Sequence, residues 1–241
     1  MSKLCDLHTH ILPGIDDGAS TMEYALEMLK NAVASDVEFI VATPHCNTPG
    51  ERKNYLDPDL QERFTRLQQA AASLPIQLAL GAEVHVTEEL PTHLMEGRLP
   101  SINGSRYLLT EFPMYFQKND FIKVLQEIKT CGYIPLVAHP ERYRTVCEQP
   151  QMVEQWLNMG CHVQLTGGSI LGESGKTVQR TAAFLLRYDM VACIASDAHG
   201  INWRSNFLLD VYDHLSVHYS KQYAQCLMYT NPMRICNDQS L

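Results

Sequence analysis

The chain alternates between short apolar runs rich in β-branched residues and longer stretches in which apolar residues recur every three or four positions. The short runs are typical of buried strands, and the longer stretches are typical of amphipathic helices. This alternation predicts seven strands, at KLCDLH (3–8), EFIVAT (38–43), QLALGAE (77–83), YLLTEF (107–112), IPLVAH (134–139), HVQLT (162–166) and VACIAS (191–196). Strands that alternate with helices are expected to lie parallel, joined by right-handed crossovers.

The stretches between these strands predict the helices. They cover residues 21–35, 57–72, 121–132, 149–160 and 178–188, with one or two further helices between about 205 and 230. Ser20 followed by Glu23 is the pattern of a capping box at a helix start. Asp57-Pro58 is the pattern of an N-cap followed by proline at the first helical position.

Seven near-equal βα units favour a closed or nearly closed barrel over an open, doubly wound sheet. We therefore expect an α/β fold, a distorted (βα)7 TIM-like barrel with extra C-terminal helices, forming a single domain over residues 1–241. Gly167-Gly168 and the GESGKT run (172–177) resemble nucleotide-binding turns, but they lack the full spacing of those motifs. We interpret them as ordinary loop glycines.

Composition narrows the possible partners. The chain has 241 residues, and 27 acidic against 19 basic side chains give a formal charge of −8, which argues against a nucleic-acid surface. An anionic substrate would then have to be held by local arginines or metal ions. No apolar run approaches the roughly 18 residues of a membrane span, so no membrane insertion is expected. The absence of a signal-peptide pattern and the eight scattered cysteines predict reduced thiols and a cytoplasmic location.

Ionisable side chains gather where the predicted strands end. They are Asp6, His8, His10, Asp16, Asp17, His45, Glu83, Glu111, His139, Glu141, Arg142, Asp197 and His199. The carboxyl ends of barrel strands converge on one face, so these side chains should meet there. Imidazole and carboxylate together bind divalent metals such as zinc, manganese and iron. Since burying so many charges without compensation would be costly, we expect a metal cluster at this face.

Any single member of this set, taken alone, is explained by an ordinary structural role, because a lone histidine is more often a surface or core residue than a ligand. The prediction depends on the shared position of many such residues. His8 and His10 are two residues apart in a strand, so both rings lie on one face and can chelate one ion. The remaining histidines lack such neighbours and receive no role: His85, His93, His162, His214 and His218.

The run HCNTPGER (45–52) raises a different mechanism, since His45-Cys46-x5-Arg52 is the local pattern of cysteine-dependent phosphatases. A phosphate-cradling loop should carry small residues and lead directly into a helix. Here Glu51 would repel a phosphate dianion, and no helix is expected before about residue 58. We therefore interpret His45 as a metal ligand, Cys46 as an inert neighbour and Arg52 as a loop cation that helps to attract acidic phosphopeptides.

The motifs DLHTH, TPH, GAE, HPER and SDAH resemble those of the PHP (polymerase and histidinol phosphatase) superfamily of metal-dependent phosphoesterases. LPGIDDG, LTEF, AHPERY and VQLTGGSILG make the chain similar to the bacterial CpsB/CapC branch. Members of that branch are protein-tyrosine phosphatases that act on autokinases controlling capsule and exopolysaccharide synthesis. The resemblance covers nearly the whole chain. It implies a distorted (βα)7 barrel with three divalent metal ions, usually manganese, with iron or zinc as alternatives.

The resemblance also implies a role for each matching residue. The three ions would be held by His8, His10, Glu83 and Asp197; by Glu83, Glu111 and His139; and by Asp17, His45 and His199. Arg142 of HPER and Arg204 of HGINWR would bind the phosphoryl oxygens. Metal ions that share a water lower its pKa, so a bridging hydroxide is expected to attack phosphorus. A phenol leaving group needs little acid help, which a metal-bound water or His199 could supply.

Two other functions remain open on the residues alone. A small-metabolite phosphatase, for instance one acting on histidinol phosphate, is disfavoured because such relatives commonly carry histidines where this chain has Asp17 and Glu111. A non-catalytic regulator that binds a kinase is disfavoured by the intact ligand set. The expected partner is the phosphotyrosine tail of a bacterial tyrosine kinase, bound by a monomer.

Overall fold

The computed structural model describes residues 3–50, 53–202, 204–205 and 207–241. Every strand pairing within these residues is parallel. The strands are β1 (Leu4–Thr9), β2 (Val37–Ala42), β3 (His45–Cys46), β4 (Gln77–Leu80), β5 (Glu83–His85), β6 (Tyr107–Glu111), β7 (Ile134–Ala138), β8 (His162–Thr166) and β9 (Cys193–Ala195). All seven predicted strands are confirmed. The third is divided into β4 and β5, and the second is followed by the short β3.

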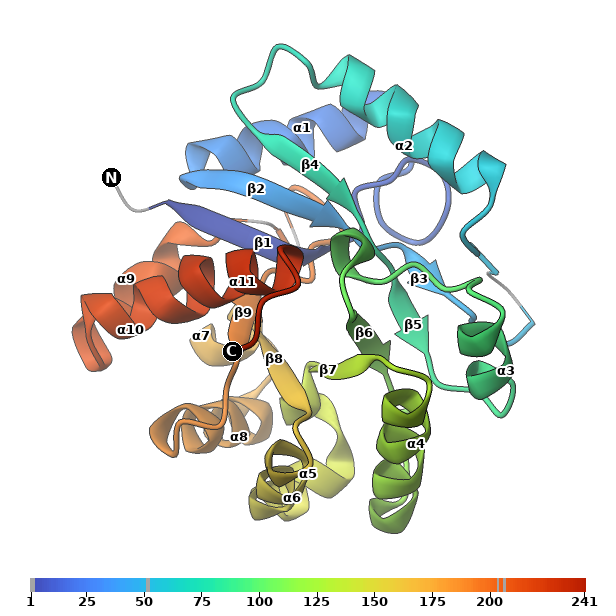
Figure 1. Cartoon of the computed structure of the whole chain (residues 1–241). Coiled ribbons are helices and arrows are strands. Elements are labelled where there is room, and N and C mark those ends of the chain that lie inside the picture. The colour runs from blue at the N-terminus through green and yellow to red at the C-terminus, as the bar shows by residue number, and fades with distance from the viewer. Residues whose placement is uncertain (1–2, 51–52, 203, 206) are drawn as a thin grey trace.

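The strands form two sheets, in the orders β1-β2-β4 and β3-β5-β6-β7-β8-β9. The two sheets are continuous at both junctions. On one side β2 leads into β3 and β4 leads into β5, and the connecting segments stay paired: the Gly81 amide donates to the Ala42 carbonyl at 2.9 Å, and the Glu83 amide donates to the Pro44 carbonyl at 3.1 Å. On the other side, the Asp197 amide donates to the His8 carbonyl and the His10 amide donates to the Ala198 carbonyl, both at 2.8 Å. The strands therefore follow one another around a distorted (βα)7 barrel, as the sequence predicts (Figure 1).

Helices surround the strands in Figure 1, and the five predicted between strands are all present. They are α1 (Met22–Ala34), α2 (Pro58–Ala70), α4 (Lys118–Thr130), α6 (Val153–Asn158) and α8 (Lys176–Arg187). Three short helices that the sequence pattern did not predict are α3 (Leu90–Met95), α5 (Arg144–Glu148) and α7 (Gly167–Leu171). The tail forms α9 (Leu209–His218), α10 (Lys221–Gln225), a π-helical turn (Cys226–Thr230) and α11 (Asn231–Cys236). No helix among the described residues is both long and apolar enough to cross a membrane.

The two predicted helix starts have different outcomes. Asp57 caps α2 by accepting a hydrogen bond from the Leu60 amide at 3.0 Å, with Pro58 at the first helical position, as predicted. The capping box at Ser20 is wrong. Thr21 is the N-cap of α1, because its extended backbone brings its hydroxyl to the Tyr24 amide at 3.2 Å.

The prediction that Gly167 and Gly168 are loop residues is also wrong, since both belong to α7. Each lies where a side chain has no room. A Cβ atom on Gly167 would lie 2.8 Å from Val211 Cγ2, and one on Gly168 would lie 2.5 Å from Glu173 Oε2. The two glycines therefore let α9 and the segment after α7 approach the end of β8 closely.

Alternate residues of the strands belong to two different apolar clusters, because both faces of a parallel sheet are buried. The larger cluster joins one strand face to the surrounding helices, as with Leu108 and Val137. The smaller one joins the other face, including Leu109 and Leu136, to residues of α11. The Tyr107 hydroxyl donates to the Gln239 carbonyl at 2.8 Å. Since β6 begins at Tyr107, the chain terminus covers the amino ends of the strands.

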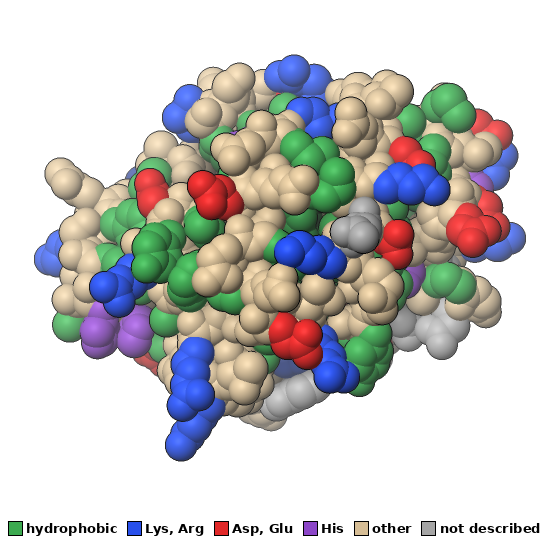
Figure 2. Space-filling view, turned by 90° about the horizontal axis from the view of Figure 1, so that it is seen from below, with side chains coloured by type: hydrophobic (Ala, Val, Ile, Leu, Met, Phe, Trp, Pro, Cys, Tyr) green, Lys and Arg blue, Asp and Glu red, His purple; other side chains and the backbone are tan. Residues whose placement is uncertain are grey.

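The molecular surface carries charges of both signs. Figure 2 shows Lys and Arg side chains interspersed with Asp and Glu over the face seen from below. This mixture accords with the formal charge of −8 and with the absence of a basic stripe in the sequence.

Candidate metal centre

The histidines and carboxylates that the sequence places at strand ends come together at the carboxyl ends of the strands. Three groups of potential ligand atoms form there, and the atoms of each group lie within 4.8 Å of one another. The groups are His8, His10, Glu83 and Asp197; His45, Glu83 and Glu111; and His10, Asp17, His45 and His199. Because Glu83, His10 and His45 each belong to two groups, the three groups form one continuous cluster.

The first group is wholly buried. His8 Nε2 lies 3.2 Å from Glu83 Oε2 and 3.4 Å from Asp197 Oδ1. His10 Nε2 lies 3.3 Å and 3.5 Å from the same two oxygens. Two imidazole nitrogens and two carboxylate oxygens thus point at one small volume. This is the set expected around the first ion.

The outer nitrogen of each of these two rings is already engaged. His8 Nδ1 lies 2.9 Å from Gln164 Oε1, and His10 Nδ1 lies 2.8 Å from Asp16 Oδ2. If Nδ1 carries the proton in both rings, Nε2 presents its lone pair to the cluster. Such partners orient metal-binding histidines and fix their tautomer. Sequence reasoning missed Gln164, because it searched the strand ends for ionisable groups and β8 has none there.

The second group differs in part from the expected set. His45 Nδ1 lies 3.1 Å from Glu83 Oε2 and 3.8 Å from Glu111 Oε2. His139, expected here, is not among the atoms of this group, although its Nε2 lies 2.8 Å from Glu83 Oε1 and 3.8 Å from Glu111 Oε1. His139 and His45 therefore face the same two carboxylates through different oxygen atoms.

The third group lies nearer the surface. His45 Nε2 is 3.4 Å from Asp17 Oδ1, and His199 Nε2 is 3.7 Å from Asp17 Oδ2. The rings of His10 and His199 approach to 3.8 Å between centroids. Asp17 is half exposed, whereas His199 is buried. The group holds the three expected residues and adds His10.

His85, which received no role from the sequence, contacts this cluster. Its Nδ1 lies 3.2 Å from Glu111 Oε2, and its side chain is partly buried. The same carboxylate oxygen faces His45. His85 therefore contacts Glu111 at the edge of the cluster. Its position two residues after Glu83 in β5 was the available signal, since alternate residues of a strand share a face.

Three carboxylates from the predicted set serve the surrounding backbone instead. Asp6 accepts hydrogen bonds from the Ser196 amide at 2.9 Å and the Ser196 hydroxyl at 2.6 Å. Asp16 accepts from the His45 amide at 3.0 Å, besides its contact with His10. Glu141 accepts from the Thr166 amide at 3.0 Å. These bonds tie neighbouring strand ends together.

Two residues of the centre have a left-handed backbone. His139 has φ of 34° and Asp197 has φ of 54°, at the ends of β7 and β9. Residues other than glycine rarely adopt this conformation, and it is concentrated at functional sites. The turn lets each side chain leave its strand toward the cluster.

The electrostatic balance keeps the carboxylates charged. Burial raises the pKa of Glu83, but His8, His10 and His139 oppose it and hold that pKa well below its usual range. Burial likewise raises the pKa of Asp197, and the nearby His8 and His10 hold it well below its usual range. Burial, His10 and Arg204 lower the pKa of His199 to about 3, so that ring is neutral. Burial lowers the pKa of His8 and His10, but the carboxylates that face them raise it above its usual value. Cations bind to ionised carboxylates and neutral imidazoles, so a bound metal ion would replace the protons that these two rings favour without it.

Several buried atoms of the centre make no hydrogen bond. They include Asp197 Oδ1 and His199 Nε2. Such atoms are costly to bury unless a partner satisfies them. Both atoms belong to the groups described above, so the residues fit a divalent metal ion as that partner.

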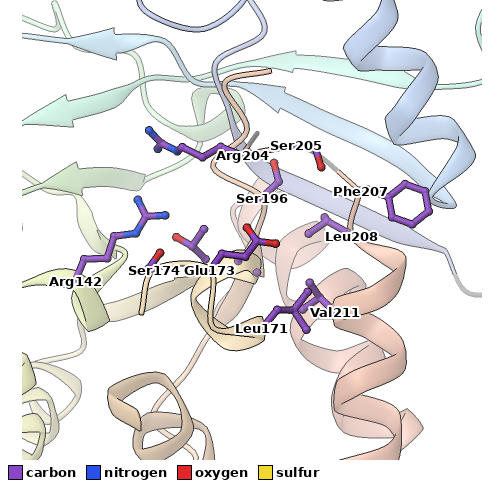
Figure 3. A pocket seen from close by; sticks show the side chains of 13 residues that line it. Arg142, Leu171, Glu173, Ser174, Ser196, Arg204, Ser205, Phe207, Leu208 and Val211 are labelled. Carbon is purple, nitrogen blue, oxygen red and sulfur yellow. The ribbon is translucent and has the colours of Figure 1, made fainter. Parts of the chain in front are cut away.

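Arg142 and Arg204 reach the same carboxylate from two segments of the chain. Both guanidinium groups donate to Asp197 Oδ2. Figure 3 shows the two groups on one side of a cavity of about 290 Å³. The cavity thus has a cationic side directly beside the first ligand group, where a phosphoryl group could bind.

Cys46 is unsuited to nucleophilic attack. It is buried, and its Sγ donates to the Lys53 carbonyl at 3.1 Å. Burial raises the pKa of this thiol, so it stays protonated at neutral pH. Glu51 and Arg52, the other residues of that pattern, lie outside the described residues. α2 begins at Pro58, as predicted, and no helix among the described residues follows Cys46 directly.

A parallel βα barrel with clustered histidines and carboxylates at its carboxyl end defines the class of metal-binding α/β barrels. The family within that class follows from comparison with known proteins. Residues 4–237 match the family described as capsular polysaccharide synthesis, CpsB/CapC, and the chain belongs to this family.

Two relatives show how far the similarity extends. The chain is 32% identical over 205 residues to the tyrosine-protein phosphatase YwqE of Bacillus subtilis, covering 84% of this chain and 80% of the relative. It is 29% identical over 248 residues to the tyrosine-protein phosphatase CpsB of Streptococcus pneumoniae, covering 98% and 99%.

Solved structures support the same relationship. The chain is similar to one from the crystal structures of YwqE from Bacillus subtilis and CpsB from Streptococcus pneumoniae, described as unique metal-dependent tyrosine phosphatases. The TM-score is 0.91 at 28% identity, over 99% of this chain and 96% of that one. A phosphotriesterase homology protein from Escherichia coli, at 10% identity and a TM-score of 0.61, shares the fold alone.

Proposed function

We propose that this protein is a metal-dependent protein-tyrosine phosphatase. Its substrate is phosphotyrosine on a bacterial tyrosine autokinase that regulates capsular or exopolysaccharide synthesis. The observation that carries the proposal is the buried cluster around Glu83 and Asp197 with two arginines bound to its edge. Membership of the CpsB/CapC family and the names of the relatives YwqE and CpsB support the substrate class.

The cluster would hold three divalent ions, with manganese as the native metal and iron or zinc as alternatives. The proposed ligands are His8, His10, Asp17, His45, Glu83, Glu111, His139, Asp197 and His199. When bound, such ions lower the pKa of a shared water and so provide a nucleophile for phosphorus at neutral pH. The grouping supports this assignment, with Glu83 common to two of the ligand groups.

The arginines would bind and orient the substrate. Arg142 and Arg204 would donate hydrogen bonds to phosphoryl oxygens, in which a guanidinium can engage two oxygens at once. Asp197 Oδ2 holds both side chains at the edge of the cluster before substrate binds. In the transition state the same donors would stabilise the charge on those oxygens.

His199 serves better as a ligand than as an acid. Burial, His10 and Arg204 lower its pKa to about 3, so it is a neutral imidazole at neutral pH and a poor proton donor. A phenol leaves with a pKa near 10 and needs little protonation in the transition state. We therefore assign no dedicated general acid among the described side chains. We further propose that the protein acts as a single-domain monomer, over residues 1–241, in the cytoplasm.

The test combines elemental analysis of the purified protein with turnover measurements. A phosphotyrosine peptide and histidinol phosphate are compared as substrates in manganese buffer, each with and without EDTA. We expect hydrolysis of the peptide, loss of activity in EDTA and recovery when manganese is restored. Cleavage of histidinol phosphate without cleavage of the peptide would show that the substrate is a small metabolite and not phosphotyrosine. A metal-loaded protein without activity on any phosphoester would instead support the kinase-binding regulator.

A further inference from the structure

The cavity beside the arginines has two sides of opposite character. Figure 3 shows the Arg142 and Arg204 guanidinium groups on one side and Phe207, Leu208 and Val211 on the other. Leu171 of α7 completes the apolar side. A ligand that fills this cavity would therefore have an anionic end and an apolar end.

The apolar side is built into the fold. Leu208 and Val211 are almost fully buried, and they pack where Gly167 leaves room for α9. Phe207 is 40% exposed and lies at the rim. The cavity thus has a wall of buried aliphatic side chains with one partly exposed aromatic ring at its opening.

A carboxylate lies between the two sides. Glu173 is exposed and lines the cavity, and its Oε2 lies above Gly168. This negative charge disfavours a second anionic group along the ligand. The favoured ligand carries its negative charge only at the end that meets the arginines.

We propose that this cavity is an aryl-group subsite, in which the ring of a phosphorylated tyrosine packs against Leu171, Leu208, Val211 and Phe207. This proposal rests on the proposed function, because the phosphoryl group is placed at the arginines beside the metal ligands. A phenyl ring buries a large apolar area and gains from contact with another aromatic ring. The short alkyl chain of phosphoserine offers much less apolar area to this wall. The subsite therefore selects aryl over alkyl phosphomonoesters.

Binding of two phosphonates to the manganese-loaded protein tests this subsite without turnover. Phenylphosphonate and methylphosphonate share the anionic head, and their carbon–phosphorus bonds resist hydrolysis. We expect the wild type to bind phenylphosphonate about tenfold more tightly, from the buried ring. Phe207→Ala should remove most of that preference and leave the Kd of methylphosphonate unchanged. Phe207→Leu should keep part of it.

Tyr188→Ala is the matched control, since Tyr188 is an exposed aromatic residue at the C-cap of α8 and does not line the cavity. It should bind both phosphonates as the wild type does. An equal affinity of the wild type for the two phosphonates would overturn the subsite. So would a preference that Phe207→Ala leaves intact.

Turnover of a phosphotyrosine peptide by the wild type separates this inference from the proposed function. Hydrolysis of the peptide without a Phe207-dependent preference for phenylphosphonate would leave the function standing and reject the subsite. A Phe207-dependent preference without hydrolysis of any aryl phosphate would reject the function and leave the subsite standing.

Discussion

The two ends of the barrel are built from the same strands but have opposite chemistry. At the carboxyl ends, buried histidines and carboxylates crowd around Glu83 and Asp197. At the amino ends, apolar and thiol side chains such as Cys5, Tyr107 and Cys193 pack with α11. The polar end has a high desolvation cost, which bound cations would offset. The apolar end stabilises the fold through buried area. Stability and chemistry are therefore separated along each strand.

The largest expected effect comes from breaking the polar end. Asp197→Ala removes a carboxylate that faces His8 and His10 and anchors both arginines. We expect kcat/KM for a phosphotyrosine peptide to fall by about a thousandfold or more. Steady-state kinetics measures this, with Glu154→Ala on the surface of α6 as the control. Activity within tenfold of the wild type would show that the cluster is not the reaction centre.

A substitution at the apolar end should reduce stability and leave activity nearly unchanged. Leu136 is fully buried in the smaller apolar cluster, so Leu136→Ala leaves a cavity there. We expect the free energy of unfolding to fall by about 3 kcal/mol while kcat stays near the wild-type value below the melting temperature. Urea denaturation and kinetics on the same sample measure both quantities. A large fall in kcat with unchanged stability would contradict the separation of the two ends.

The edge of the polar end can be weakened without removing a ligand. His85→Ala removes the imidazole whose Nδ1 lies 3.2 Å from Glu111 Oε2. Residues that orient metal ligands contribute about 10- to 100-fold to metal affinity, and we expect a loss at the lower end of that range. Competition with a chelator gives the affinity, and His218→Ala on α9 is the control. Unchanged manganese affinity would show that Glu111 needs no such support.

The smallest effect is expected at Cys46. Burial raises the pKa of its thiol, so Cys46→Ser should leave kcat/KM within about twofold of the wild type, and iodoacetamide should not inactivate the enzyme. EDTA should inactivate both proteins equally. A folded but inactive Cys46→Ser variant, together with a wild type that keeps its activity in EDTA, would restore the thiol mechanism.

Much of this architecture could be predicted from local pattern. The seven strands follow from apolar runs, and the helices between them follow from apolar residues at helical spacing. The predictions were wrong where a local sequence signal is compatible with two structures. Thr21 and Ser20 can both cap a helix, and the backbone of Thr21 decides between them. Gly167 and Gly168 suggest a loop by themselves, but their role depends on Val211 and Glu173.

The sequence alone determined the order of the elements and the candidate ligands, because both depend on spacing along a strand and position at its end. The tertiary structure alone decided which atoms meet. It paired Gln164 with His8 and His85 with Glu111, and it placed His45 beside Glu83. It also brought Leu208 and Val211 to the cavity that Arg142 lines. Such contacts join residues far apart in the chain, and the packing of whole elements sets them, so no local pattern contains them.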